Sequence, residues 1–295
     1  MKILSFEDRV VDTVAAILVI VFAICCAYPL IYCLSMSFSD DNAILTNSVT
    51  LLPEGFNLES YKILLGQGQF WTSLRNSAVL VVVGTVWQVS CTFALGYVLS
   101  RRDFVFRNAL TVYITIPMFF GGGLIPTFLL IKNLGLYDSW AAIILPAGVS
   151  IWNAILAKTF IRNNIPAELI ESARIDGADD FQILFRLVLP LSTTIIAILC
   201  LYAAVGFWND YMDALIYLQN TELQPLQLYL RNILLKSSAL VEDSSIDPEA
   251  VIKSIVENTR IKYVLIVVST LPIVIFYPFL QKYFVKGVML GSIKG

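Results

Sequence analysis

The chain has 295 residues, of which 58% are hydrophobic and 14% are charged, and its mean hydropathy is +0.77. Soluble domains carry about a quarter charged residues, so one soluble core could not bury this much apolar surface, and the composition indicates a membrane protein. The net charge of −2 and the lack of a basic cluster argue against a nucleic-acid partner.

Histidine, the commonest general base and a common metal ligand, does not occur in the chain. The five cysteines lie inside apolar runs and lack the spacing of a zinc site or a CxxC motif. We therefore predict no catalytic residue, no metal site and no cofactor bound by this chain. The cysteines, which we interpret as small buried apolar side chains, are Cys25, Cys26, Cys33, Cys91 and Cys200.

Six stretches without a charged residue are long enough, or nearly so, to cross about 30 Å of hydrocarbon. Because backbone polar groups must be paired inside lipid, we expect six transmembrane helices in an all-α polytopic fold, kinked where prolines fall inside them. The first run is too long for the apolar core of a signal peptide, which favours a retained helix. The predicted spans are Val14–Leu34, Asn76–Ser100, Asn108–Ile131, Ser139–Ala157, Leu187–Asn209 and Tyr263–Gln281.

The distribution of lysine and arginine predicts the orientation of these spans. Basic residues gather near the N-terminus, in the connectors after the second and fourth spans, and in the C-terminal tail. The opposite short connector carries only Lys132, and the long loops on that side also contain many acidic residues. We therefore expect a multi-pass protein of the cell membrane with both termini in the cytoplasm.

Two sizeable loops are expected on the outer side of a single transmembrane domain, 1–295. Residues 35–75 contain a short surface helix predicted after Pro53. Residues 219–260 form a polar extracellular loop. In it, Asp247, Pro248 and Glu249 indicate a helix start, because proline suits the first helical position and acidic residues suit the first turn.

A polar segment, residues 166–186, connects the fourth and fifth spans on the cytoplasmic side. Pro166 suits the first position of a helix, Gly177 can end that helix in a left-handed conformation, and Asp179 and Asp180 can cap a second helix. We predict a helix–glycine–helix unit beneath the membrane, which is either a solvated connector or a docking surface. Its expected apolar residues are Leu169, Ile170 and Ala173 in the first helix, and Phe181, Leu184, Phe185 and Val188 in the second.

This segment resembles the signature of permease subunits of ATP-binding-cassette importers, which is Glu-Ala-Ala, three residues, Gly, nine residues, Ile-x-Leu-Pro. Here Glu171-Ser172-Ala173 is followed by Gly177 and by Leu187-Val188-Leu189-Pro190 at the same spacing, with serine for alanine and leucine for isoleucine. The resemblance implies the type I importer permease fold and coupling helices that dock in a cleft of an ATPase subunit. The residues it places there are Glu171, Ser172, Ala173, Asp176, Gly177, Ala178 and Phe181.

Other stretches extend the resemblance over almost the whole chain. The stretches at 28–40 and 206–218 are similar to sugar permeases, most of all to the complex-carbohydrate permeases of Gram-positive bacteria. The tail "YFVKGVMLGSIKG" at 283–295 resembles that of the smaller permease of the maltose importer, which implies ATPase contacts for Gly291, Lys294 and Gly295. In that importer, a loop placed like 219–260 probes the site of the binding protein, and the alternative here is a simple docking rim.

The resemblance implies a sugar permease, for oligosaccharides, that pairs with a homologous second permease in the lipid membrane. Two ATPase subunits and an extracellular sugar-binding lipoprotein complete the expected assembly. The chain has no Gly-x-x-x-x-Gly-Lys-Ser/Thr phosphate loop, so ATP and Mg²⁺ are expected on the partner subunits and no enzymatic activity on this chain.

The substrate pathway is expected to combine aromatic faces with a few polar groups. The alternative for each such residue is an interfacial aromatic belt or a cap. Gly121–Gly123 is either a hinge or, as we favour, a close helix-packing site. The main pathway candidates are Trp152 and Asn153 on the fourth span, and Trp208, Asn209, Asp210 and Tyr211 on the fifth. Further candidates are Trp87 and Gln88 on the second span, and Tyr202, Phe207 and Asp213 on or next to the fifth.

Three other functions are weighed against the sugar permease. An importer of the same class for a peptide, phosphate or polyamine has the same architecture. An ion-coupled secondary transporter would need ionisable groups in mid-membrane, which the spans lack. An intramembrane enzyme would need a nucleophile–base pair or a metal cluster, and the sequence offers neither.

Overall fold

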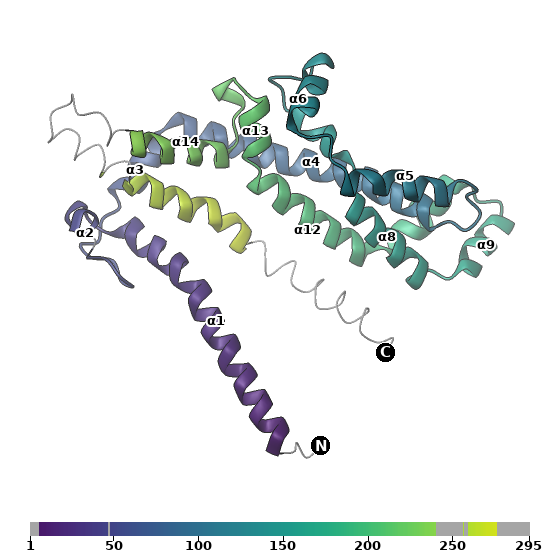
Figure 1. Ribbon diagram of the computed structural model, residues 1–295, viewed down its shortest axis with the longest axis horizontal. Coiled ribbons are helices and arrows are strands. Elements are labelled where there is room, and N and C mark those ends of the chain that lie inside the picture. Colours follow the sequence, from purple (N-terminus) through teal and green to yellow (C-terminus); the bar gives the residue numbers. More distant parts are fainter. Residues whose placement is uncertain (1–5, 47, 240–255, 257–258, 276–295) are drawn as a thin grey trace. The chain divides into compact units, whose positions relative to one another are not determined.

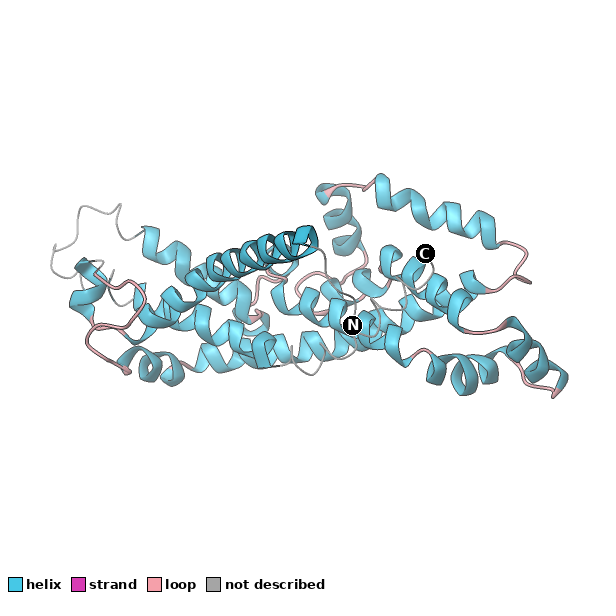
Figure 2. Cartoon of the chain, turned by 90° about the horizontal axis from the view of Figure 1, so that it is seen from below, coloured by secondary structure: helices cyan, strands magenta, loops and turns pink. Residues whose placement is uncertain are grey.

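The structure is a computed structural model that describes residues 6–46, 48–239, 256 and 259–275. Every regular element in these ranges is helical (Figure 2), which confirms the all-α prediction. The residues group into two compact units. Unit 1 comprises Met1–Gly68 and Leu230–Leu271, and unit 2 comprises Gln69–Tyr229 and Pro272–Gly295.

The long helix α1, Phe6–Phe38, opens unit 1 and contains the first predicted span (Figure 1). Its segment Val10–Phe38 is long and apolar enough to cross a membrane, and its most apolar part is not buried by the rest of the chain. A helix that leaves apolar side chains such as Phe22 exposed is suited to lipid or to a partner helix as its surroundings.

The short helices of unit 1 pack around the end of α1. They are α2, Asp41–Thr46, and α3, Glu59–Gly66, and α3 is the helix predicted after Pro53. A further helix covers 259–275, and its Arg260 is buried, donates from Nε to Ser60 Oγ at 2.7 Å and pairs with Asp41. The small core of this unit consists of Met36, Ala43, Ile44 and Val49, with Tyr32 and Tyr263 packed against it.

Unit 2 is built along α4, Gly68–Ser100, a continuous helix that contains the second predicted span. Gly96 lets α4 approach the helix α8, Ile151–Asn164: a Cβ at Gly96 would lie 2.6 Å from the Cβ of Ala157 and 3.0 Å from the carbonyl oxygen of Ala154. Since real Cβ contacts are not this short, the glycine is what allows the two backbones to pack so closely.

The third predicted span is two helices rather than one. They are α5, Arg107–Phe119, and α6, Leu124–Asn133, which are bent by 114° at the break between them. Gly123 has a φ of 82°, and a Cβ at Gly121 or Gly122 would meet nothing within 4 Å. Within this chain the packing interpretation of Gly121–Gly123 is therefore wrong, and the glycines form the bend.

The fourth predicted span, Ser139–Ala157, is also interrupted. It contains α7, Ala141–Ile144, then a 3₁₀ turn at Pro146–Gly148, and only then the start of α8. Pro146 begins the turn, and Val149 and Ser150 are extended before α8. Trp87 of α4 lies against Gly148, where a Cβ would approach its Nε1 to 2.6 Å, so this interruption also brings the backbone close to α4.

The fifth predicted span, Leu187–Asn209, is bent by 83° between a helical stretch, Asp180–Leu191, and α12, Thr193–Asn209. The first stretch is made of α10, Asp180–Gln182, a π-helical turn, Ile183–Val188, and α11, Leu189–Leu191. Pro190 has no N–H to give to a carbonyl one turn earlier, which fits a local change of helix type. Figure 1 shows α12 beside α8, and the two helices are in contact.

Three shorter elements follow α12. They are α13, Met212–Tyr217, a 3₁₀ turn, Thr221–Leu223, and α14, Leu226–Ala239. The first part of the predicted loop 219–260 is thus helical, and its residues 240–255, including Asp247, Pro248 and Glu249, lie outside the described residues.

Two described helices meet the length and composition of a membrane span, or four if each bent pair is one span. Six spans stay a prediction, and the last one, Tyr263–Gln281, is described only to residue 275. The prediction of buried cysteines is wrong: two cysteines, Cys25 and Cys26, are exposed and three are partly exposed. Apolar runs that face lipid expose their side chains to it, so an apolar neighbourhood in sequence does not imply burial in the chain.

Candidate functional site

The polar segment predicted over residues 166–186 forms a compact helix–turn–helix unit. Its first helix is α9, Ala167–Ile175, and Pro166 stands just before it rather than at its first position. Gly177 has a φ of 87°, and its N–H donates to the carbonyl oxygen of Arg174 at 3.0 Å. The N–H of Ala178 donates to the carbonyl oxygen of Ala173 at 2.9 Å. These two bonds form a Schellman motif, which satisfies the last carbonyls of α9 and confirms the predicted role of Gly177.

The second helix of the unit starts at a capping box. The N–H of Gln182 donates to Asp179 Oδ1 at 2.7 Å, and Gln182 Oε1 accepts from the N–H of Asp179 at 3.3 Å. This reciprocal pair satisfies two otherwise unpaired donors at the start of α10. Asp179 is therefore the cap that the sequence predicts, whereas Asp180 is the first helical residue and has another role.

The seven residues predicted to couple to an ATPase lie together on this unit. Five are exposed: Glu171, Ser172, Asp176, Gly177 and Phe181. The other two, Ala173 and Ala178, are partly buried and pack against a core below, together with Ile170. Five of the predicted docking residues are therefore accessible to a partner, whereas Ala173 and Ala178 help to attach the unit to the core.

Three predicted apolar positions are exposed instead. Leu169 is 39% exposed, Phe181 is 73% exposed and Phe185 is 59% exposed, whereas Leu184 and Val188 contact the core as predicted. The stripe was predicted at the regular spacing of an α-helix, and the π-helical turn from Ile183 to Val188 changes which residues share a face. Ile175, which was not singled out, is 86% exposed.

The core below the unit joins three long elements of unit 2. Phe93 and Tyr97 come from α4, Ala157 and Ile161 from α8, and Ile195 and Leu199 from α12. Ile183 and Val188 of the π-helical turn enter the same cluster, and all of these side chains are buried. The helix–turn–helix unit is thus attached by apolar packing as well as by its two chain connections.

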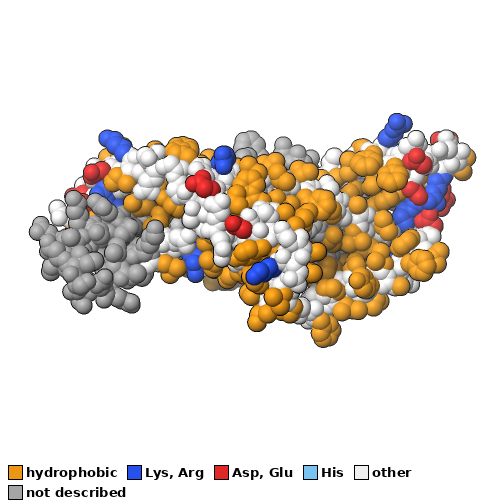
Figure 3. All heavy atoms as spheres, turned by 90° about the horizontal axis from the view of Figure 1, so that it is seen from above, with side chains coloured by type: hydrophobic (Ala, Val, Ile, Leu, Met, Phe, Trp, Pro, Cys, Tyr) orange, Lys and Arg blue, Asp and Glu red, His pale blue; other side chains and the backbone are white. Residues whose placement is uncertain are grey.

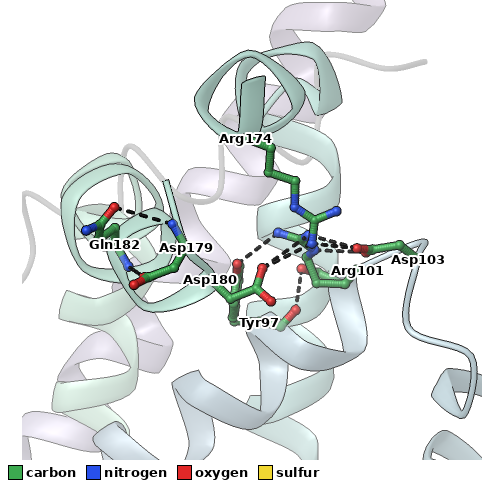
Figure 4. A network of polar contacts seen from close by, with 8 residues as sticks. Tyr97, Arg101, Asp103, Arg174, Asp179, Asp180 and Gln182 are labelled. Carbon is green, nitrogen blue, oxygen red and sulfur yellow. Dashed lines mark hydrogen bonds and ion pairs between the residues drawn. The ribbon is translucent and has the colours of Figure 1, made fainter. Parts of the chain in front are cut away.

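A network of charged side chains lies beside this core, where α4 ends (Figure 4). Arg101 donates from Nε and Nη2 to the two oxygens of Asp103, at 3.0 and 2.9 Å, and from Nη1 to the hydroxyl of Tyr97 at 2.9 Å. Arg174 of α9 reaches Asp103 at 2.7 Å and Asp180 at 3.1 Å. Arg101 and Asp180 are 3.5 Å apart, so the network joins α4, the following loop, α9 and α10.

The two arginines of the network favour the charged form of Asp103. The hydrogen bonds from Arg101 hold the pKa of the Asp103 carboxyl well below its usual range, and Arg174 acts in the same direction. Only 10% of the Arg101 side chain is exposed, whereas Asp103 and Arg174 are 47% and 43% exposed. Solvent therefore screens the outer pairs, and Arg101 is the best-shielded charge of the four.

A cavity of about 400 Å³ opens next to the network. Its walls come from the end of α4 and the following loop, from the end of α8, and from the inner side of α9. Figure 3 shows charged side chains gathered at the end of unit 2 that carries α9, beyond a surface that is largely hydrophobic. The charged residues that line the cavity are Arg101, Arg102, Asp103, Arg162, Glu168, Glu171 and Arg174.

Four of the predicted pathway residues gather at one place. Asp210, between α12 and α13, lines a smaller cavity of about 170 Å³ together with Gln88, Phe207 and Asp213. Burial raises the pKa of the Asp210 carboxyl, and the nearby charge of Asp213 adds to this rise. Gln88 is fixed there by the hydrogen bond from its Nε2 to the carbonyl of Ala147, at 2.7 Å.

The other candidates do not line this cavity. Trp208 and Asn153 are buried, whereas Trp152 is 60% exposed and Tyr211 is 39% exposed. Asn209 donates to the carbonyl of Val205 in its own helix, at 3.0 Å. The cavity therefore brings together four predicted candidates, Gln88, Phe207, Asp210 and Asp213, and the pathway role of the others stays a prediction.

The predicted ATPase-contacting residues of the tail, Gly291, Lys294 and Gly295, lie outside the described residues. The part of the site that the sequence reasoning missed is the network of Arg101 and Asp103. The sequence signal was the run Arg101-Arg102-Asp103 directly after a span, which was interpreted only as an orientation signal. Among the described residues, no group of three or more His, Cys, Asp or Glu side chains is placed to hold a metal ion.

Comparisons with known proteins agree with this architecture. Residues 88–290 match the family model of the binding-protein-dependent transport system inner membrane component. The polygalacturonan/rhamnogalacturonan transport system permease protein YtcP of Bacillus subtilis is 39% identical over 289 residues, which cover 98% of this chain and 100% of that protein. The arabinooligosaccharides transport system permease protein AraQ of Halalkalibacterium halodurans is 28% identical, and the match covers 91% of each chain.

One solved structure resembles the fold throughout. It is a crystal structure of a bacterial ABC transporter involved in the import of the acidic polysaccharide alginate, and one of its chains matches with a TM-score of 0.84 and 33% identity. The match covers 96% of this chain and 100% of that chain. The family model, the relatives and the fold agree: the chain is a transport subunit rather than an enzyme, and it belongs to the inner membrane components of binding-protein-dependent transport systems, with the helical permease fold of ABC importers.

Proposed function

We propose that the chain is one permease subunit of an ATP-driven importer that takes up oligosaccharides from an extracellular binding protein. The observation that carries this proposal is the helix–turn–helix unit of residues 166–186, held in one shape by a Schellman motif and a capping box. The relatives support the class of solute, since they are permeases for polygalacturonan or rhamnogalacturonan and for arabinooligosaccharides. The transporter in the similar crystal structure is involved in the import of alginate.

The exposed face of this unit supports ATPase docking. Ile175 and Phe181 leave most of their apolar surface uncovered at the end of the unit where charged residues gather. Exposed apolar side chains among polar ones are typical of an interface. Glu171 is exposed beside them, so an ATPase cleft would meet both an acidic and an apolar group.

The proposed topology has six spans with both termini in the cytoplasm. The Lys and Arg distribution supports this orientation, because Arg101, Arg102 and Arg107 lie near the same end of unit 2 as α9. The two bent pairs, α5 with α6 and α10–α11 with α12, would each supply one span, and the interrupted region from α7 to α8 another.

The proposed assembly contains a homologous second permease, two ATPase subunits that hold ATP and Mg²⁺, and an extracellular sugar-binding lipoprotein. The family name supports the binding protein, and the fold match to a chain of an ABC transporter supports the ATPases. The tail residues Gly291, Lys294 and Gly295 are proposed to contact the ATPases, and the loop 219–260 to face the binding protein.

For the substrate pathway we propose the small cavity at Asp210, which four of the predicted candidates line. Carboxylates accept hydrogen bonds from sugar hydroxyls, and the Gln88 amide offers a fixed polar group beside the ring of Phe207. Asp213, the other acidic candidate, belongs to the same cavity.

The proposal is tested on the complete complex in proteoliposomes, with intact chain and with Ile175→Asp. The matched control is Val105→Asp, because Val105 is 89% exposed in the loop after α4 and is not part of the helix–turn–helix unit. The binding protein is added with oligogalacturonides, arabino-oligosaccharides, raffinose or alginate oligomers, and ATP hydrolysis and solute uptake are measured.

We expect at least one of these sugars to stimulate ATP hydrolysis. Ile175→Asp should lower the stimulated rate about tenfold or more, because it places a charge in a desolvated contact, while Val105→Asp leaves it within about twofold. Equal rates for the two variants would contradict docking through this unit. Stimulation by a peptide, phosphate or polyamine, but by none of the sugars, would contradict the carbohydrate substrate while leaving the importer class standing.

A further inference from the structure

The helix α4 is fixed at both of its ends to other functional segments of unit 2. At one end, Arg101 and Asp103 form the charged network with Arg174 of α9 and Asp180 of α10. Only 10% of the Arg101 side chain is exposed, and each of its three nitrogens donates within the network. Arg102, the next residue, forms no ion pair with any residue that the structure describes.

At the other end, α4 holds the segment that leads into α14. Asn76 is fully buried, and its Nδ2 donates to the carbonyls of Glu222 and Gln224, at 2.7 and 3.1 Å. Ser77 Oγ accepts from the N–H of Leu226 at 2.8 Å, which pairs one of the unpaired donors at the start of α14. These bonds fix residues 221–226 to α4.

The body of α4 between these ends is stiff. It is one α-helix from Gly68 to Ser100 without a proline. From Asn76 to Arg101 its length is about 38 Å at 1.5 Å per residue. A helix without a break transmits displacement along its axis better than a bent pair, and both neighbouring helix pairs of unit 2 are bent by more than 80°.

The unit α9–α10 also has room to move relative to α8. Pro166 is extended between the two helices, and the cavity of about 400 Å³ separates the inner side of α9 from the end of α8. The ion pair of Arg174 with Asp103 connects α9 to the end of α4, while Ile170 and Ala173 pack against the core to which α8 contributes.

We propose that α4 is a rigid rod that couples the ATPase-docking unit, through Arg101 and Asp103, to residues 221–226, through Asn76 and Ser77. Arg101, Asp103, Asn76 and Ser77 are thereby positioning residues of the transport cycle. This inference rests on the proposed function. It adds that movement passes along one helix between the ATPase-docking unit and residues 221–226. The binding protein acts on the face of residues 221–226, and the ATPase acts on the face of α9.

The test compares Arg101→Gln with its neighbour control Arg102→Gln in the complete complex. The measured quantity is the factor by which the sugar-loaded binding protein stimulates ATP hydrolysis, with the sugar that stimulates best in the panel above. Arg101→Gln removes shielded, charge-assisted hydrogen bonds and should lower this factor about tenfold, while Arg102→Gln should change it by less than about twofold. Basal hydrolysis and the yield of assembled complex should stay unchanged, and Arg101→Lys should restore part of the factor because it keeps the charge.

The decisive variant combines the two ends. Asn76→Ala alone should also lower the stimulation factor about tenfold, because it leaves two carbonyls unpaired, and Ser77→Ala is the milder substitute if Asn76→Ala assembles poorly. Distant sites with independent effects would multiply to about a hundredfold loss in the double variant. If α4 connects the two ends, Arg101→Gln and Asn76→Ala interrupt the same coupling. The stimulation factor of the double variant should then stay near the tenfold loss of each single variant.

Two results would contradict the proposal that α4 couples the docking unit to residues 221–226. One is a multiplied loss in the double variant, and the other is equal behaviour of Arg101→Gln and Arg102→Gln. Both can occur while Ile175→Asp still abolishes stimulation, in which case docking through α9 stands and only the path along α4 is wrong. Equal behaviour of Ile175→Asp and Val105→Asp would instead overturn the proposed function itself.

Discussion

Single glycines decide where the helices of unit 2 approach each other. Gly96 has backbone and side-chain atoms of α8 within 3.2 Å of the place where a Cβ would be, whereas Gly206, in α12, has nothing within 4 Å of it. Both residues are inside helices, where alanine is intrinsically favoured by about 1 kcal/mol. Substitution by alanine should therefore change the free energy of unfolding in opposite directions at the two positions. The comparison separates the effect of packing from that of helix propensity.

Gly96→Ala should lower the free energy of unfolding by about 1–3 kcal/mol, because α4 and α8 must separate to accept the methyl group. Gly206→Ala should raise it by about 0.5–1 kcal/mol. Thermal unfolding of the two purified variants in the same detergent measures the difference. A loss of stability at both positions would mean that the close approach of α4 and α8 is not what Gly96 provides.

At the scale of elements, the helix–turn–helix unit is stabilised by local bonds at each joint. The capping box at Asp179 starts its second helix and the Schellman motif at Gly177 ends its first. Such local motifs can be predicted from sequence, because they depend on residues a few positions apart. Gly177 and Asp179 were predicted in these roles for this reason.

Asp179→Ala should lower the free energy of unfolding by about 1 kcal/mol, because the N–H of Gln182 loses its acceptor. Asp176→Ala is the matched control, since Asp176 is exposed and its side chain forms no hydrogen bond with a described residue. Hydrogen exchange at the amide of Gln182 should speed up in the first variant only. Equal exchange in both variants would show that the capping box does not hold the start of α10.

Other properties of the elements could not be predicted from sequence. Phe185 is exposed within a π-helical turn, and a pattern based on 3.6 residues per turn cannot detect such a turn. The network of Arg101 joins residues about 70 or more positions apart in sequence, so only the folded chain brings them together. The sequence indicates Gln88 and Asp210 as pathway candidates, but only the packing of α4 against α12 shows that they meet in one cavity.

At the scale of the whole molecule, composition alone was enough to assign a helical membrane protein. The number of spans is harder to predict from the sequence, because three of the six predicted runs are bent or interrupted. The breaks lie at Gly121–Gly123, at Pro146 and at Ser192. Lack of charge predicts that a run can lie in lipid, but it does not predict that the run is one straight helix. The single-domain assignment of 1–295 stays a prediction beside the two compact units.

The proposed topology can be tested with single cysteines in a chain whose five native cysteines are replaced. Leu52→Cys, at a residue that is 76% exposed in unit 1, should react with a membrane-impermeant maleimide in intact cells. Arg102→Cys, in the loop after α4, should react only after the cells are opened. The reverse pattern would place α9 outside the cell and contradict ATPase docking there.

The Schellman motif and the capping box have an evolutionary consequence. All four of their hydrogen bonds run between residues 173 and 182, and none of them uses the exposed side chains of Glu171, Ile175 or Phe181. Mutations at these three positions therefore alter the surface that we propose to meet an ATPase, without altering the hydrogen bonds that shape the unit. Related permeases can therefore evolve to use a different ATPase, or to share one ATPase among several uptake systems, through substitutions at a few exposed positions.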